Sequence, residues 1–217
     1  MTTAPASGKK LVVTASVFGL LALAAPALAG PPFVCHPFDI GATTSLPWGS
    51  STNNYLAMRD DYDVRNVVAD TAKLLTPDMP TIVRMETLRR AAIYASRDRA
   101  IAQQLIESLI GRAKNGDALA LFDAGYAIEA VNELEMAGRY DKQLRGLDRV
   151  LAGITDASHG RVMIEKSLSL RPDASVEFAL GLISRAPENE TRFAKARIAA
   201  QHDDLLAANL ARMQLLQ

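Results

Sequence analysis

The stretch DALALFDAGYAIEAVNELEMAGRY, residues 117–140, has the pattern of one long helix with a marked start and a marked end. Its apolar residues recur every three or four positions, which is the spacing of a helix packed along one side: Leu119, Phe122, Tyr126, Ala130 and Leu134. Asp117 is a good N-cap because its carboxylate can accept from the first unpaired amides of a helix. Gly138 is a typical end signal. The pattern predicts a helix over 117–137.

The same texture extends through the chain from about residue 58, where Ala, Leu, Arg, Glu and Ile dominate and strand alternation is absent. Gly, Pro and Asp interrupt it at intervals that suit helix ends and helix starts. The expected helices lie near 60–76, 80–95, 98–114, 117–137, 140–153, 160–170, 173–185 and 188–215. Helices joined by short turns pack as antiparallel pairs. The sequence therefore predicts an all-α fold.

Two passages resemble the joints between tetratricopeptide repeats: KSLSLRPDASVEFALGLI, residues 166–183, and MAGRYDKQL, residues 136–144. In the second, Gly138 corresponds to the glycine that lets two helices approach, and Tyr140 to the tyrosine that wedges between them. The resemblance covers about 50 residues, and a strict 34-residue period is not visible. It implies a short right-handed α-solenoid whose concave face could hold a peptide or protein. An irregular helical domain is the alternative.

The amino terminus has the three parts of a secretory signal peptide: a basic head, an uncharged run over Leu11–Ala25, and a small-residue exit that ends at Ala29. Cleavage is expected between Ala29 and Gly30. The alternative is a retained anchor helix over Leu11–Ala29, near the lower length limit for a membrane span. Either way the rest of the chain would be exported, to the periplasm or the extracellular space. After cleavage no membrane span is expected.

Charge and motifs argue against several function classes. The chain carries 24 Lys and Arg against 24 Asp and Glu, so nothing in its charge favours a nucleic-acid partner. It contains no Gly-rich phosphate loop, no Gly-x-Ser-x-Gly elbow, no His-Glu-x-x-His pair and no haem-attachment motif. We therefore expect no cofactor and no defined catalytic site.

Residues 30–57 form a separate region, rich in Pro and Gly, between the leader (1–29) and the helical domain (58–217). Prolines disfavour a helix here, so an extended, irregular arm is expected. Its apolar residues, among them Phe33, Phe38 and Trp48, should pack along the first helices. The CHPFDIG opening with LPW soon after also resembles the start of some exported bacterial proteins of unknown role, which implies no function.

The arm contains Cys35, the only cysteine, beside His36 and four positions before Asp39. Thiolate, imidazole and carboxylate are all zinc ligands, which makes these three residues candidates for a metal site. A single cysteine in an exported chain is also a candidate for a reactive thiol or for a disulfide-linked dimer. The simplest alternative is a small residue that packs the arm against the helices.

Two sets of residues are candidates for binding a partner. The segment VRMETLRRAAIYASRDRA, residues 83–100, is the densest basic stretch. We expect a solvated surface in which Glu86 pairs with Arg90, with an anion-binding or acidic-peptide patch at Arg89 and Arg90 as the alternative. Most aromatic residues should lie in the core, but Tyr126 or Tyr140 could be displayed in a groove between stacked helices.

Together these observations favour an exported helical protein-interaction or scaffolding domain that binds another envelope or secreted protein or peptide. Two alternatives remain at this point. The first is a periplasmic metal-binding or thiol-redox protein that uses Cys35 and His36. The second is an enzyme with a polar site between helices, which the sequence does not locate.

Overall fold

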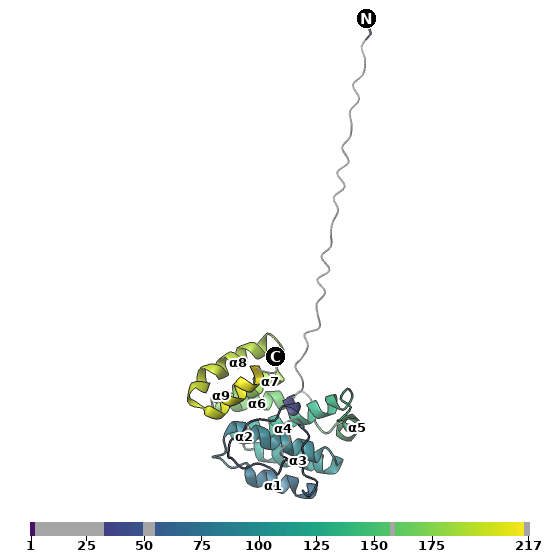
Figure 1. Ribbon diagram of the computed structural model, residues 1–217, viewed down its shortest axis with the longest axis vertical. Helices are drawn as coiled ribbons and strands as arrows, with labels where there is room; N and C mark the ends of the chain where they lie inside the picture. The colour runs from purple at the N-terminus through teal and green to yellow at the C-terminus, as the bar shows by residue number, and fades with distance from the viewer. Residues whose placement is uncertain (3–32, 50–54, 157–158, 215–217) are drawn as a thin grey trace.

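The computed structural model describes residues 1–2, 33–49, 55–156 and 159–214. The leader and its expected cleavage position, Ala29–Gly30, lie outside these residues. The described part of the chain contains nine α-helices packed together and no strand (Figure 1), which confirms the all-α prediction. The helices are α1 (Val67–Leu74), α2 (Thr81–Ala95), α3 (Arg99–Ala113), α4 (Ala118–Ala137), α5 (Leu147–Leu151), α6 (His159–Leu170), α7 (Ala174–Ile183), α8 (Glu188–Ala199) and α9 (Asp204–Gln214). Three short 3-10 helices add η1 (Phe33–Cys35), η2 (Val64–Asn66) and η3 (Ala200–His202).

The centre of the molecule is α4, the long helix expected from residues 117–137. Its N-cap is Asp117, whose carboxylate accepts from the amide of Ala120 at 2.8 Å, as the sequence predicted. The helix contacts α2, α3, α5, α6 and α7. Figure 1 shows it in the middle of the bundle, with α1 at one end and α8 and α9 at the other. A helix with neighbours on several sides buries most of its residues, and α4 does so.

Small residues allow α4 to approach α6 closely. A Cβ atom on Gly125 would lie 2.5 Å from the carbonyl oxygen of Gly160 and 2.8 Å from the side chain of Ile164. Only glycine fits at such a contact, because these distances are shorter than van der Waals separation. The same occurs between α7 and α8, where a Cβ on Gly181 would lie 2.6 Å from the ring of Phe193.

Three expected helices differ from the prediction. The helix expected over 60–76 is only α1, preceded by η2, because residues 60–62 form turns and Asp63, whose carboxylate accepts from the amide of Arg65, caps η2. The helix expected over 140–153 is only α5, because residues 139–146 form turns and Gly146 adopts a φ of +93° just before the helix. The helix expected over 188–215 is broken into α8 and α9. Asp203 is extended, and its carboxylate accepts from the amide of Leu206 at 3.0 Å, which starts a new helix there.

The arm lies against the helices. Phe33, Val34, Phe38 and Leu46 are all buried in the same core as the helical residues. In the part of the chain that the structure describes, no helix combines the length and the apolar character needed to cross a bilayer.

Candidate functional site

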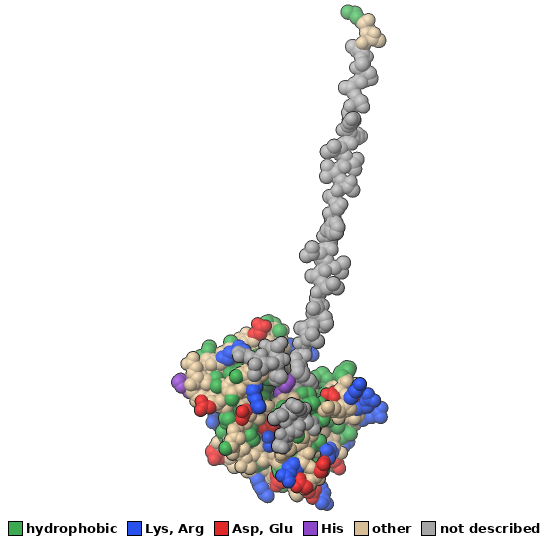
Figure 2. Space-filling view, in the orientation of Figure 1, with side chains coloured by type: hydrophobic (Ala, Val, Ile, Leu, Met, Phe, Trp, Pro, Cys, Tyr) green, Lys and Arg blue, Asp and Glu red, His purple; other side chains and the backbone are tan. Residues whose placement is uncertain are grey.

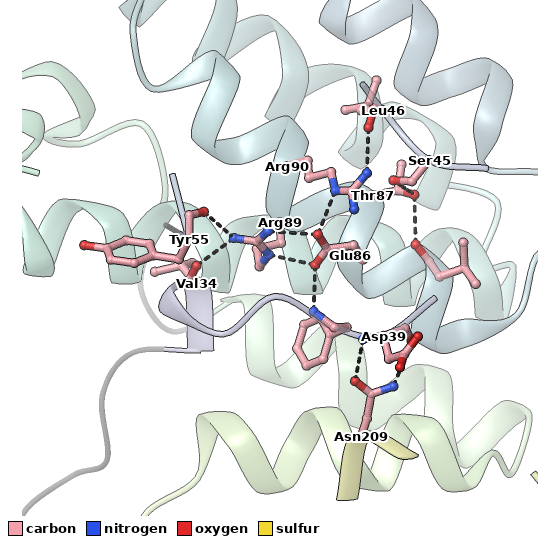
Figure 3. A network of polar contacts seen from close by, with 12 residues as sticks. Val34, Asp39, Ser45, Leu46, Tyr55, Glu86, Thr87, Arg89, Arg90 and Asn209 are labelled. Carbon is pink, nitrogen blue, oxygen red and sulfur yellow. Dashed lines mark hydrogen bonds and ion pairs between the residues drawn. The ribbon is translucent and has the colours of Figure 1, made fainter. Parts of the chain in front are cut away.

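Polar side chains of α2, α4 and α9 bind the main chain of the arm. Figure 3 shows the contacts made from α2 and α9. We call residues 33–48 the arm segment. The arm groove is the set of side chains that hold it: Glu86, Arg89 and Arg90 of α2, Glu133 of α4 and Asn209 of α9. An irregular segment leaves main-chain amides and carbonyls without partners, and burying them is costly unless other groups bind them. The arm groove supplies those partners.

Glu86 is the centre of the groove. One of its carboxylate oxygens accepts from the amide of Phe38 at 3.0 Å. The carboxylate also pairs with Arg89 at 2.8 Å and with Arg90 at 2.7 Å, and its side chain is completely buried. Burial alone would raise the pKa of Glu86, but the hydrogen bonds and positive charges of the two guanidinium groups lower it below its usual value. Glu86 is therefore an anion held by four N–H groups from three residues.

The two arginines carry this charge network to carbonyl groups of the arm. Arg89 donates to the carbonyl oxygen of Val34 at 2.9 Å and to that of Tyr55 at 3.1 Å. Arg90 donates to the carbonyl oxygen of Leu46 at 2.7 Å. Both guanidinium groups also lie over the ring of Trp48, at 5.1 and 5.6 Å from its centroid, within the range of a cation–π interaction.

Asn209 of α9 binds the arm in the way that one strand binds another. Its Oδ1 accepts from the amide of Asp39 at 2.8 Å, and its Nδ2 donates to the carbonyl oxygen of the same residue at 2.9 Å. Asn209 is 2% exposed and Asp39 is half-buried, so both bonds are partly shielded from water. This pair of bonds recognises an extended main chain without regard to the side chain of Asp39, whose carboxylate instead accepts from the amide of Gly41.

Apolar contacts fix three aromatic residues of the arm segment. Phe33 packs on Tyr126 with ring centroids 5.0 Å apart, and Phe38 packs edge-on against Phe178 at 6.1 Å. Trp48 packs edge-on against Tyr94 at 5.4 Å. The arrangement therefore combines main-chain hydrogen bonds with aromatic contacts, which is the chemistry that holds an extended peptide.

The groove ends at Glu133, whose Oε2 accepts from the amide of Val34 at 3.2 Å. Burial raises the pKa of Glu133 to about 8, and the nearby charge of Glu129 acts in the same direction. Within the described residues the buried hydroxyl of Tyr126 has no hydrogen-bond partner. Glu133 is thus a carboxyl group that changes its charge close to neutral pH at the point where the arm begins.

Cys35 lies next to this end of the groove and is half-buried. Its thiol interacts with the hydroxyl of Tyr55, which donates in turn to Asp141 at 2.6 Å. Burial raises the pKa of Cys35 to about 11, so the thiol is protonated at neutral pH. A protonated thiol is a poor nucleophile and a poor metal ligand. This environment does not favour thiolate chemistry.

The three residues considered for a metal, Cys35, His36 and Asp39, lie close together along the arm. Among the residues that the structure describes, no group of three or more His, Cys, Asp or Glu side chains is placed to hold a metal ion. The carboxylate of Asp39 is turned to its own loop, and the thiol of Cys35 is turned to Tyr55.

The candidate interaction residues divide into two groups. Tyr126 and Arg89 are fully buried and Arg90 is largely buried, so in this structure they contact the arm and the core. Tyr140, in contrast, is 83% exposed; it does not wedge between helices as the tetratricopeptide resemblance implied. Instead, Gly138 packs directly on the start of α5, where an added Cβ would lie 2.5 Å from the amide of Asp148.

The expectation of a solvated surface along residues 83–100 is wrong for Arg84 and Arg89, which are completely buried. The Glu86–Arg90 pair is confirmed. Arg84 pairs with Asp123 of α4, donating to both carboxylate oxygens at 2.7 and 2.8 Å. Burial raises the pKa of Asp123 to about 6. Sequence reasoning missed this partner, although a single acid within the apolar run LFDAGY is a signal of a buried pair.

Sequence reasoning also missed Glu133 and Asn209. Each stands on a helix face like many other polar residues, and only the path of the arm makes it a ligand.

Comparisons of the chain with protein-family models, with curated proteins and with solved structures give no match.

Proposed function

We propose that this protein is an exported helical protein-interaction domain that binds extended segments of polypeptide, with its own arm segment as the resident occupant of the binding groove. The observation that carries the proposal is the recognition of main-chain atoms. Side chains from three helices bind the amides of Val34, Phe38 and Asp39 and the carbonyl oxygens of Val34, Asp39 and Leu46.

Such contacts bind a wide range of sequences, because every extended peptide offers the same amides and carbonyls. Specificity would come from the aromatic positions, above all the place that Phe38 takes against Phe178. The expected partner is an envelope or secreted protein with an extended segment that carries an aromatic residue at this position. The tetratricopeptide-like passages support the proposal, since helix pairs of that family hold extended peptides.

The groove is not an open concave face. Because α4 has neighbours on several sides, the helices enclose a core, and the arm segment lies buried against it. A partner would therefore have to replace the arm segment. The short α-solenoid implied by the resemblance is consistent with the packing of α6, α7 and α8 as successive neighbours, and the proposal applies it to this part only.

The test breaks the covalent link between the arm segment and the helical domain but leaves the arm segment in place. A protease site placed between Gly49 and Tyr55 allows the chain to be cut after folding, so that the arm segment is held by its contacts alone. A labelled peptide of residues 33–48 should then exchange into the groove and bind saturably. The same peptide with Phe38→Asp is the matched control and should bind much more weakly, because an ionised side chain cannot occupy the aromatic position.

Asn209→Ala in the domain should weaken binding of both peptides, because it removes two main-chain bonds. If the cut domain instead loses its helical structure when the arm leaves, the arm is a permanent part of the core and the proposal fails. If the parent peptide and the peptide with Phe38→Asp bind equally, the position that Phe38 takes against Phe178 does not give specificity.

A further inference from the structure

A surface knob, residues 136–149, lies at the end of α4 and the start of α5, just beyond the Glu133 end of the groove. It presents two large apolar side chains four positions apart: Met136, which is 50% exposed, and Tyr140, which is 83% exposed. Tyrosine has an apolar ring and a polar hydroxyl, and it is enriched where proteins meet the headgroup region of membranes. Single exposed apolar side chains are ordinary on protein surfaces, and Ile198 is another at 75% exposed, so the two in the knob are distinguished by the cations beside them.

The knob is also basic. It carries four cations, Arg139, Lys142, Arg145 and Arg149, and two acids. Of the cations, only Arg139 has an ion-pair partner among the described residues: Glu135, at 3.2 Å. Figure 2 shows blue and green side chains together at the edge of the molecule where Figure 1 places α5.

Four cations against two acids leave the knob with a formal net charge of +2. Asp141 accepts from the hydroxyl of Tyr55 at 2.6 Å and from the amide of Gln143 at 2.7 Å, so it is directed at its own loop and the arm. The second acid of the knob is Asp148, in the first turn of α5. One further cation lies close by: Arg99 of α3 donates to the carbonyl oxygens of Val150 and Ala152, directly after the knob.

The knob lies where the chain enters the domain. Cys35 interacts with Tyr55, and Tyr55 bonds to Asp141 in the knob, so the start of the arm segment is next to it.

We propose that the knob binds an anionic lipid surface, with Tyr140 and Met136 in the headgroup region and Lys142, Arg145 and Arg149 against the lipid phosphates. A protein partner fits the geometry less well, since a stable protein interface covers about 800 Å² on each side and needs a complementary hollow or flat face. A small convex knob with exposed cations suits a lipid surface, where each cation acts separately. The proposal does not depend on the arm groove.

The experiment measures how much of the chain from Gly30 onward binds to lipid vesicles. Starting at Gly30 keeps every buried side chain of the described residues, since these lie between Phe33 and Leu210. Vesicles of phosphatidylcholine with about one third phosphatidylglycerol are compared with vesicles of phosphatidylcholine alone. The parent should bind the anionic vesicles, and binding should fall as salt rises. Each cation at an anionic surface raises partition about fivefold, so the combined variant Lys142→Gln, Arg145→Gln and Arg149→Gln should bind about a hundredfold more weakly.

The matched control carries Lys166→Gln, Arg171→Gln and Arg197→Gln, which makes the same change in net charge at three exposed cations elsewhere. It should retain most of the binding. In a separate variant, Tyr140→Trp, the emission of the introduced indole should shift to the blue on anionic vesicles, which reports directly on the knob. All variants change exposed side chains, and unchanged helical circular dichroism shows that they are folded.

Three outcomes overturn the proposal. The first is equal loss of binding in the two triple variants, which shows a general charge effect. The second is no binding of the parent to anionic vesicles. The third is binding to an acidic polypeptide such as polyglutamate together with no blue shift of the Tyr140→Trp variant on vesicles, which assigns the knob to a protein partner.

Discussion

Two arginine-rich segments of this chain have similar compositions and opposite environments: VRMETLRRAA, residues 83–92, and RYDKQLRG, residues 139–146. In the first, Arg84 and Arg89 are completely buried. In the second, Arg139 and Arg145 are exposed to solvent. Arginine itself does not decide between the two environments, so the neighbours must.

The difference lies in what each segment meets. Helix α2 carries Glu86 and faces Asp123 of α4, and it also meets an irregular arm whose carbonyl groups need donors. Arginine has five donors in a fixed plane, so it can pair with an acid and bind carbonyls at once. The knob offers no such set of acceptors, and its cations stay in water. Arginine is therefore buried in this protein where nearby carboxylates and arm carbonyl groups need hydrogen-bond donors.

The buried Arg84–Asp123 pair gives the largest expected effect. Asp123→Ala leaves the guanidinium of Arg84 buried without its counter-ion, which should lower the free energy of unfolding by about 3–5 kcal/mol. The matched variant Asp148→Ala, in the knob, should change it by less than about 0.5 kcal/mol. Urea unfolding followed by circular dichroism measures both.

A double variant sharpens this test. Arg84→Met with Asp123→Leu replaces the pair by apolar side chains, and it should be more stable than Asp123→Ala because no charge is left unpaired. The double variant is compared with Arg84→Met and Asp123→Leu made singly. If its loss in free energy of unfolding equals the sum of the two single losses, the two residues act independently and the pair does not explain the burial of Arg84.

Glu133 gives the next effect, which depends on pH. Its pKa in the folded protein is about 8, above the ordinary value of 4.5, so the folded state keeps a proton that the unfolded state releases between these values. The stability contributed by this group is therefore lost as pH rises from about 4.5 to 8. The full difference in pKa corresponds to about 5 kcal/mol, and the partial exposure of Glu133 reduces it, so Glu133→Gln should raise stability by about 2 kcal/mol at pH 9, with little effect at pH 4.

The control is Glu135→Gln, two residues further along α4, where the carboxylate pairs with Arg139 near the surface. It should leave the pH dependence of the urea midpoint unchanged. A parent whose stability does not fall between pH 5 and pH 8 would contradict the assigned pKa of Glu133.

These contrasts show how far the sequence could lead. The ends of α2, α3 and α4 were predicted to within about two residues, because Pro80, Asp98 and Asp117 are strong local start signals. The break between α8 and α9 was missed, since an Asp203 cap competes there with an otherwise continuous helical pattern. A local signal predicts a helix end well only where no competing helical pattern continues past it.

The site was less predictable for a different reason. That Glu86 pairs with Arg90 follows from their spacing on one helix, and the structure confirms it. That Asn209 binds Asp39 depends on two segments 170 residues apart, and nothing in either one marks it as a ligand. Contacts to the main chain carry no side-chain pattern, so a sequence cannot reveal them without the path of the arm.

Asn209 provides the third prediction. Asn209→Ala removes one bond to each main-chain group of Asp39 in a buried setting, and should lower the free energy of unfolding by about 1–2 kcal/mol. Amide hydrogen exchange should accelerate most at Asp39, while the amides of α4 keep their protection. The surface variant Gln103→Ala, whose partner Glu107 is exposed, serves as control and should alter neither quantity. Uniform loss of protection throughout the domain would show that Asn209 supports the whole fold and has no special role in holding the arm.

The smallest effect is expected in the knob, and it is the most informative for the lipid proposal. Arg145→Ala should change the free energy of unfolding by less than about 0.5 kcal/mol, because the side chain is exposed and has no ion-pair partner among the described residues. The same urea measurement applies. A cost above about 2 kcal/mol would mean that Arg145 has a partner in the folded protein, as Arg89 does. The cation would then belong to the fold, and the contrast between the two arginine-rich segments would no longer support a free basic surface at the knob.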